Sequence, residues 1–272
     1  ALYERHKVLT YPRTDSRALP EDYIGTVKKT MEALSSSGAY SPFAKRVLKS
    51  GWVKPNRRVF DNTKISDHFA IIPTLQSPKH LNEAEQKLYD FVVRPFLAVF
   101  YPAAEYLQTT RITQLGKHQF HTDGRVLVNP SWLEVYGRGA EEAGETMPAI
   151  ATGERASARE VTVQPNRTKP PARYTEATLL SAMEGAGKLV EDDELRAAME
   201  TKGLGTPATR AAIIEGLLQE EYIHREGREL VPTPKAFSLL FALHMLGIVE
   251  LASPELTGEW EHKLKLIERG EM

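Results

Sequence analysis

Apolar residues recur at helical spacing in three stretches of the first hundred residues. The first predicted helix starts at Pro20 and stops before Gly38, and its apolar face consists of Ile24, Val27, Met31 and Leu34. A second helix is predicted over residues 43–49. The third covers residues 82–100, where Pro95 is expected to kink or split the helix and one side carries Leu88, Phe91, Val92 and Phe96.

The spacing of apolar residues changes to a period of two after Tyr106, which is typical of strands. Strands are predicted at 108–115, 119–122, 125–128 and 161–163. The two prolines at positions 170 and 171 then form a stiff, extended joint, which indicates a boundary.

Helical spacing returns after the two prolines. A helix capped by Thr175 carries Leu179, Leu180 and Met183. Another is predicted with Thr206 as its N-cap and Pro207 in the first helical position, and its core face consists of Ile213, Ile214, Leu217 and Leu218. A hairpin at 225–228 and a helix from Thr233 follow, so this part resembles a winged helix.

Together these patterns predict an α+β multidomain protein. The three predicted domains are a mixed domain over residues 1–100, a β-rich domain over 101–172 and a helical, winged-helix-like domain over 173–272. The chain starts inside an apparent helix and ends within a pattern, so we interpret it as a fragment of something longer.

The composition is that of an ordinary globular protein, with 41% hydrophobic and 26% charged residues among 272. No apolar run approaches the ~18 residues that a membrane span needs, and no targeting peptide is visible. Cysteine is absent, which excludes disulfides, thiolate nucleophiles and cysteine-based zinc sites. A reducing cytoplasm is compatible with that composition.

The net charge of −1 hides an uneven distribution along the chain. Residues 1–74 carry 13 Lys and Arg against 7 Asp and Glu, a balance of +6, and the remaining residues carry 22 against 29, a balance of −7. A basic segment is where phosphates would be expected to bind, although a solvated basic face has the same composition.

Tyr11 and Arg13 lie in the most informative stretch of that basic segment. Residues 8–10 are predicted to form a short strand, and Pro12 keeps Tyr11 extended and stops the strand. In an extended segment Tyr11 and Arg13 share a face. A phenol has a pKa near ~10, so a phenolate at pH 7 costs roughly 4 kcal/mol, and a nearby guanidinium lowers that cost while it binds a phosphate. The alternative is a structural tyrosine beside a surface arginine.

The octet Leu-Thr-Tyr-Pro-Arg-Thr-Asp-Ser at residues 9–16 resembles the active-site signature of type IA DNA topoisomerases. The proline after Tyr11 is most similar to the topoisomerase III branch. The resemblance implies that Tyr11 is the nucleophile and that Arg13 stabilises the phosphate, with Thr14 and Asp15 contacting the DNA.

A second motif, at residues 65–74, places His68 at the entrance to an apolar segment that Pro73 closes. A lone histidine there is commonly structural, but the segment resembles the family's second signature. The resemblance implies that His68 lies beside Tyr11 and contacts the phosphate or assists proton transfer, for which an imidazole is suited. Phe69 departs from topoisomerase III relatives, which often carry a second histidine there, and we expect this change to be tolerated.

A third motif, at residues 203–210, combines glycines with a predicted helix N-terminus, where backbone N–H groups bind anions readily. By itself, this motif is typical of ordinary helix capping. It resembles the family's Gly-x-Gly-x-Pro-x-Thr segment, which implies that Thr206, Thr209 and Arg210 hold the DNA backbone. The sequence at 256–261 also resembles the family.

The resemblance implies ATP-independent cleavage and rejoining of single-stranded DNA through a 5′-phosphotyrosine. It assigns residues 1–100 to the active-site tyrosine domain, 101–172 to part of an arch or hinge domain and 173–272 to an incomplete DNA-binding domain. Mg²⁺ would be bound by an N-terminal Toprim domain before Ala1. No metal ligands are expected here, because the consecutive acids at 191–194 would fan about 100° apart around a helix.

The expected partner is single-stranded DNA, with a helicase partner left open and no membrane. No phosphate-binding loop ending in Gly-Lys-Ser/Thr occurs, so ATP is not expected either. The expected location is the bacterial cytoplasm, on the nucleoid. Two other classes stay open at this point: a non-catalytic single-stranded DNA-binding module, and a different tyrosine nuclease such as a relaxase or recombinase.

Overall fold

The computed structural model describes residues 1–36, 38–65, 67–137, 151–155, 157, 160, 162–199 and 203–272. The chain forms two compact units, Ala1–Val161 and Thr162–Met272, and each is described by itself. Both contain helices and a two-stranded antiparallel sheet, which agrees with the predicted α+β class. Whether residues 101–172 form a separate domain stays a prediction.

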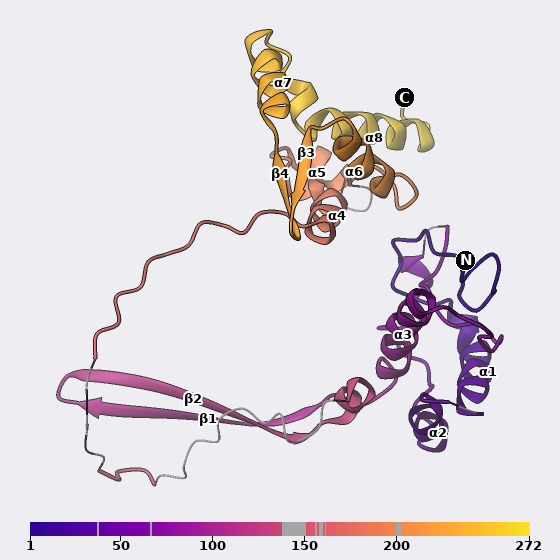
Figure 1. Cartoon of the computed structure of the whole chain (residues 1–272), viewed down its shortest axis with the longest axis vertical. Helices are drawn as coiled ribbons and strands as arrows, with labels where there is room; N and C mark the ends of the chain where they lie inside the picture. Colours follow the sequence, from indigo (N-terminus) through magenta and orange to yellow (C-terminus); the bar gives the residue numbers. More distant parts are fainter. Residues whose placement is uncertain are drawn as a thin grey trace. The chain divides into compact units, whose positions relative to one another are not determined.

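Three helices build the core of the first unit (Figure 1). They are α1 (Ile24–Ser35), preceded by the 3-10 turn Glu21–Tyr23, α2 (Ser41–Lys49) and α3 (Glu83–Ala98). The predictions of α1 and α2 are confirmed, and Val27, Met31 and Leu34 are buried as expected. A short 3-10 turn, Asn62–Lys64, lies in the segment between α2 and α3.

The prediction for α3 was correct in position but wrong in two details. The helix continues through Pro95 without a break. Its buried face consists of Tyr89, Val93, Phe96, Leu97 and Ala98, whereas Leu88 and Phe91, predicted to be on the apolar side, are 54% and 74% exposed. Residues 89, 93, 96 and 97 follow helical spacing as well as the predicted set does, so the pattern alone could not select the face.

Residues 8–10 do not form the predicted strand. A single antiparallel bridge joins Leu9 to Pro73, flanked by hydrogen bonds from the Thr10 amide to the Ile72 carbonyl and from the Thr74 amide to the Val8 carbonyl, both 3.0 Å. The Ile72 amide donates to the Thr10 hydroxyl instead of the Thr10 carbonyl, and Pro12 has no N–H to donate, so the pairing does not extend past Thr10.

A long hairpin follows α3 and leads to a 3-10 helix, Ser131–Tyr136 (Figure 1). Its strands are β1 (Glu105–Leu115) and β2 (His118–Asn129). The prediction of two strands at 119–122 and 125–128 was wrong, because Asp123 and Gly124 continue the pairing, opposite Thr110 and Thr109. Of the predicted strand at 161–163, residue 161 lies outside the described residues, and the other two are irregular.

The second unit has the predicted winged-helix elements. Its helices are α4 (Glu176–Glu184), the 3-10 turn Ala186–Leu189, α5 (Asp193–Met199), α6 (Arg210–Gln219), α7 (Pro234–Met245), the 3-10 turn Val249–Ala252 and α8 (Glu255–Glu268). The hairpin of β3 (Ile223–Glu226) and β4 (Glu229–Pro232) follows α6 (Figure 1). Thr175 forms a bridge with Glu229, which adds a short third edge to this hairpin.

None of the helices in the described parts of the chain is long and apolar enough to cross a membrane.

Candidate active site

The ring of Tyr11 lies against the imidazole of His68. The two ring centroids are 4.3 Å apart and the planes are tilted by 44°. Tyr11 is half-buried and His68 is exposed. A third ring, that of Tyr3, contacts Tyr11 edge-on, with centroids 5.4 Å apart and planes at 80°. The structure therefore brings together the two side chains that the sequence placed in one site, and it adds a third.

Hydrogen bonds from threonine side chains hold the two motifs side by side. The Thr14 hydroxyl donates to the His68 carbonyl at 2.8 Å and accepts from the Ser16 amide at 3.0 Å. The Thr10 hydroxyl accepts from the Ile72 amide at 2.9 Å. Thr14, predicted to contact DNA, is thus engaged in fixing the backbone at His68.

Arg13 and Asp15 are exposed, on the segment between Tyr11 and Ser16. The chain bends at Pro12, so the alternation that would place Arg13 beside Tyr11 does not continue through it. Within the described residues, no hydrogen bond, ion pair or cation–π contact engages the Arg13 guanidinium. An exposed guanidinium of this kind has its full set of donors for a phosphate.

The side chain of Phe69, the residue after His68, is half-buried at the edge of the core. Its ring packs against Tyr23, with centroids 4.8 Å apart, and it borders the buried cluster of the first unit. An apolar side chain is therefore suited to this position.

The loop before Val8 is tied to the start of α3, which the sequence patterns did not indicate. Arg5 pairs with the carboxylate of Glu85 at 2.5 Å, and the His6 imidazole lies 3.3 Å from the same oxygen. Glu85 also accepts from the Asn82 amide at 3.0 Å as part of a capping box. That amide, followed by the charges of Arg5 and His6, lowers the pKa of Glu85 below its ordinary value. The only signal in the sequence was the Asn-x-x-Glu spacing of the capping box.

The third motif lies in the second unit, and its helix begins three residues later than predicted. Thr209, rather than Thr206, is the N-cap of α6. Thr206 donates its amide to the Thr209 hydroxyl at 2.9 Å, and its carbonyl accepts from the Arg210 amide at 3.0 Å. Residues 206–209 thus form a closed turn ahead of the helix, in which the two threonine hydroxyls lie 3.1 Å apart.

The side chain of Arg210 is buried, with 7% exposed, beneath this turn. Its Nε donates to the Leu204 carbonyl and its Nη2 to the Gly205 carbonyl, both at 3.1 Å. In this structure the guanidinium holds the glycine-containing loop in place. The two units are described separately, so the expectation that Thr206, Thr209 and Arg210 lie near Tyr11 stays a prediction.

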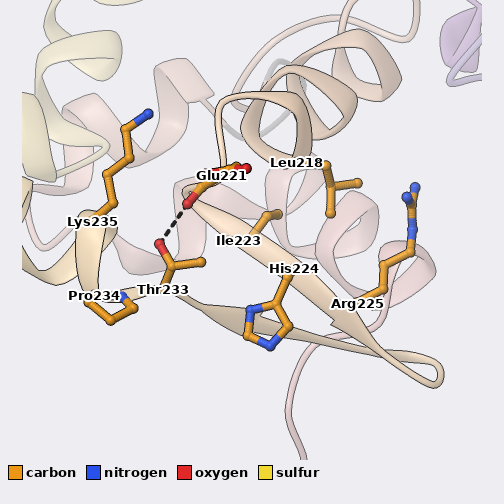
Figure 2. A pocket seen from close by; sticks show the side chains of 8 residues that line it. All are labelled: Leu218, Glu221, Ile223, His224, Arg225, Thr233, Pro234 and Lys235. Atoms are coloured by element: carbon orange, nitrogen blue, oxygen red, sulfur yellow. Dashed lines mark hydrogen bonds between the residues drawn. The ribbon is translucent and has the colours of Figure 1, made fainter.

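A hollow of about 680 Å³ lies beside the β3–β4 hairpin (Figure 2). At one end the Thr233 hydroxyl donates to the Glu221 carbonyl at 2.6 Å. The cations of its lining have carboxylate neighbours: Arg225 pairs with Glu176 at 2.6 Å and Glu215 at 2.7 Å, His224 lies 2.9 Å from Glu226, and Lys235 lies 3.7 Å from Glu220. The two carboxylates raise the pKa of Arg225 further. The two Arg225 pairs join β3 to α4 and α6, and the carboxylate beside each cation offsets the positive charge that an anion would need.

No group of three or more histidine or acidic side chains that could hold a metal ion occurs among the described residues. The acids at 191–194 form a helix start instead, where the Asp192 carboxylate accepts from the amides of Glu194 and Leu195 at 2.9 and 3.0 Å.

Comparison with known proteins gives one consistent family. All 272 residues match the family model described as DNA topoisomerase. The chain is 41% identical to a protein named DNA topoisomerase 3 from Bacillus cereus and 38% identical to the one from Bacillus subtilis, in each case over the whole chain. It spans 38% of the length of these relatives. Among solved structures, it resembles full-length topoisomerase I from Thermotoga maritima with a TM-score of 0.55 at 22% identity, over 94% of this chain and 47% of that one.

Proposed function

The chain belongs to the type IA DNA topoisomerase family, and on this premise we propose that it carries the DNA-cleaving tyrosine of a topoisomerase III-like enzyme. The substrate would be single-stranded DNA, and the complete protein would relax or decatenate DNA. The observation that carries the proposal is the contact between the Tyr11 and His68 rings, with the exposed Arg13 two residues further along the chain. Two signature motifs far apart in the sequence converge there on a half-buried phenol.

In the proposed reaction the phenol oxygen of Tyr11 attacks a backbone phosphorus. The new bond is a 5′-phosphotyrosine ester, and the bond from phosphorus to the 3′ oxygen breaks, so that a 3′-hydroxyl leaves. The phenol loses a proton and the leaving oxygen gains one. Another strand passes, and the 3′-hydroxyl then attacks the ester to restore the DNA and the phenol. Because the ester replaces a phosphodiester of similar energy, ATP is not needed.

Each neighbouring side chain has a role that follows from its chemistry. Arg13 would bind the non-bridging oxygens of the phosphate, where charge accumulates in the transition state. The exposed His68 imidazole, in contact with the Tyr11 ring, would contact the phosphate or move the proton. Thr14 would act on the site by holding the backbone of His68, and the exposed Asp15 would contact the DNA.

The turn before α6 would hold the DNA backbone through the hydroxyls of Thr206 and Thr209. Arg210 would support this turn from below through the carbonyls of Leu204 and Gly205, as its buried position indicates. We assign the turn to a DNA-binding domain over residues 173–272, beside a tyrosine domain over 1–100 and an arch domain over 101–172.

Other parts of the enzyme would come from residues outside this chain, since it spans 38% of its relatives. We propose that Mg²⁺ binds to a Toprim domain there, and that the complete protein works on the bacterial nucleoid in the cytoplasm, where a helicase is a candidate partner. The chain alone would bind single-stranded DNA weakly. We expect no relaxation of supercoiled plasmid by this chain in Mg²⁺. Efficient relaxation would contradict the proposal that residues outside this chain bind the metal.

Trapping of the covalent adduct tests the proposal. The complete protein is incubated with an oligonucleotide labelled at either end and then denatured. We expect the 3′-labelled product to migrate with the protein, because the tyrosine holds the 5′ phosphate. Tyr11→Phe should lose this adduct by a factor of 10³ or more, on the order of a lost nucleophile, whereas Tyr174→Phe, an exposed tyrosine of the second unit, should keep it.

Three outcomes would oppose the proposal. An adduct that carries the 5′-labelled product would indicate a 3′-phosphotyrosine, as in a tyrosine recombinase. An adduct that still forms in the Tyr11→Phe variant would show that another residue is the nucleophile. Single-stranded DNA binding without any adduct in the complete protein would favour the non-catalytic binding module.

A further inference from the structure

We propose that Tyr3 is a positioning residue for Tyr11, held in place by an anchor on helix α3. This inference rests on the proposed function, because it concerns how the nucleophile is oriented. The edge of one ring meets the face of the other at a centroid distance of 5.4 Å and an angle of 80°, a preferred geometry for aromatic pairs. His68 provides the other ring contact of Tyr11.

Orientation matters here because a half-buried phenol on an irregular segment has few other constraints. Tyr11 lies beyond the single bridge at Leu9 and directly before the bend at Pro12, so no strand ladder fixes its backbone. A nucleophile must be held close to the line of attack for a fast reaction. Contacts with the Tyr3 and His68 rings limit the rotation of the Tyr11 side chain.

The loop that carries Tyr3 is closed on itself and seated in the core. Both the Arg5 and His6 amides donate to the Ala1 carbonyl, at 2.9 and 3.0 Å, and the Val8 amide donates to the Leu2 carbonyl at 2.9 Å. Leu2 is buried. The loop turns back at Lys7, whose φ of 55° is left-handed.

Glu85 fixes this loop relative to the rest of the unit. Its carboxylate receives Arg5 and lies near His6, while the capping box holds it at the N-terminus of α3. Tyr89, one turn further along α3, is fully buried in the core. The position of the Tyr3 ring is thus determined by a rigid helix through Glu85 and the loop.

The surroundings of Tyr3 agree with a role toward Tyr11 rather than with core packing. The side chain is 41% exposed. Within the described residues no hydrogen bond engages its hydroxyl, so the ring alone makes the contact. Phenylalanine should therefore replace Tyr3 without loss, whereas alanine or leucine should not.

The test compares Tyr3→Ala, Tyr3→Leu and Tyr3→Phe in the complete protein with Mg²⁺. Glu4→Ala is the matched control, because Glu4 is exposed on the same loop and its side chain contacts no partner among the described residues. Single-turnover adduct formation on a labelled oligonucleotide gives the cleavage rate, titration of the same oligonucleotide gives its Kd, and thermal unfolding reports stability.

We expect Tyr3→Ala and Tyr3→Leu to slow cleavage about three- to tenfold at saturating DNA, the factor corresponding to one aromatic pair, with Kd unchanged. Tyr3→Phe and Glu4→Ala should cleave at the wild-type rate. Tyr3→Leu keeps the apolar bulk, so it remains informative if the alanine variant is unstable.

Cleavage by Tyr3→Leu at the wild-type rate, or a loss confined to Kd, would overturn the positioning role. Failure of Tyr3→Phe to restore the rate would do the same. Tyr11→Phe is measured beside these variants. If the wild-type protein forms no adduct, the proposed function itself fails. If the wild-type protein forms the adduct and the Tyr3 variants cleave at the same rate, only this inference fails.

Discussion

At the residue scale, the side chains of three threonines hold together the two segments around Tyr11, a role that backbone hydrogen bonds have in a strand ladder. Thr10 accepts from the Ile72 amide, Thr14 donates to the His68 carbonyl at 2.8 Å, and Thr74 donates to the Lys7 carbonyl at 2.6 Å. Pro12 has no N–H with which to continue the backbone pairing. Side-chain hydroxyls therefore join the two motifs while the phenol stays outside a regular sheet.

In the second unit, the requirement for glycine at position 203 is also explained by its immediate surroundings. Its φ of +67° is left-handed, and a Cβ there would lie 2.5 Å from the Glu184 carbonyl oxygen and still closer to that of Met183. The next amide, of Leu204, donates to the Met183 carbonyl at 2.8 Å. Glycine allows the loop of the third motif to pack directly on the end of α4.

Replacing this glycine tests that account. We expect Gly203→Ala to destabilise the second unit by about 2–5 kcal/mol, from the left-handed penalty plus the overlap with α4. Gly227→Ala is the matched control, because φ is +60° but nothing lies within 4 Å of the added Cβ, and about 1–2 kcal/mol is expected. Urea unfolding measures both, and equal losses would refute the close approach.

At the scale of elements, α3 links the core to the site. One face is buried in the first unit, and its N-terminal capping box holds Glu85 against Arg5 and His6. The carboxylate is more stable in its charged form there, which is why its pKa is lowered. Ionised Glu85 thus stabilises both the helix start and the Tyr3 loop.

This contribution depends on pH in a defined direction. Because the pKa of Glu85 is lower in the folded state than the ordinary value near ~4.3, its stabilisation is complete above that value and is lost as the pH falls through the folded pKa. We expect Glu85→Gln to destabilise the protein at pH 7, and we expect the difference from the wild type to shrink as the pH falls below the ordinary value and through the lowered folded pKa. Glu83→Gln, in the same turn but more exposed, serves as control in urea unfolding. A loss that does not change between pH 7 and that acidic range would contradict the linkage.

The β1–β2 hairpin has few packing contacts with the rest of the first unit. Most residues of both strands are exposed, including Leu107, Ile112, Leu115, Phe120 and Val128. Two-stranded ribbons are marginally stable in water, so cross-strand contacts carry more weight here. Arg125 lies over the Tyr106 ring at 3.4 Å, and Thr110 donates to Asp123 at 2.7 Å.

At the scale of the whole molecule, the second unit begins with a segment that has no regular structure. Residues 162–174 contain no described helix or strand and are exposed. Thr175 then starts the regular structure of the second unit, through its bridge to Glu229 and its capping box on α4. The predicted boundary at 170 and 171 falls within this segment.

Limited proteolysis should therefore separate the two units. We expect trypsin to cut earliest at Arg167 and Arg173, because exposed backbone without regular structure fits a protease most easily. Two resistant fragments, one on each side of this segment, should appear in mass spectrometry. The variant Arg167→Gln/Arg173→Gln should lose this early cut, and early cleavage inside α1, α2 or α3 would contradict the described division.

The sequence by itself determined the family and the helices of the first unit, and the proposal that Tyr11 and His68 are reactive also comes from it. Short motifs around Tyr11 and His68 are informative because they combine several residue types in a fixed order, and α1, α2 and α3 are indicated by local spacing and by the Asn82 cap. Such signals lie within a few residues of one another, so they can be read along the chain.

Only the tertiary structure decided which face of α3 is buried, that residues 8–10 form one bridge, and that Arg210 turns inward to the Leu204 and Gly205 carbonyls. It also placed the Tyr3 ring against Tyr11 through the anchor at Glu85. These features depend on contacts between residues distant in the chain. Their free energy comes from packing and from hydrogen bonds that form only when the whole unit folds, and no local pattern records them.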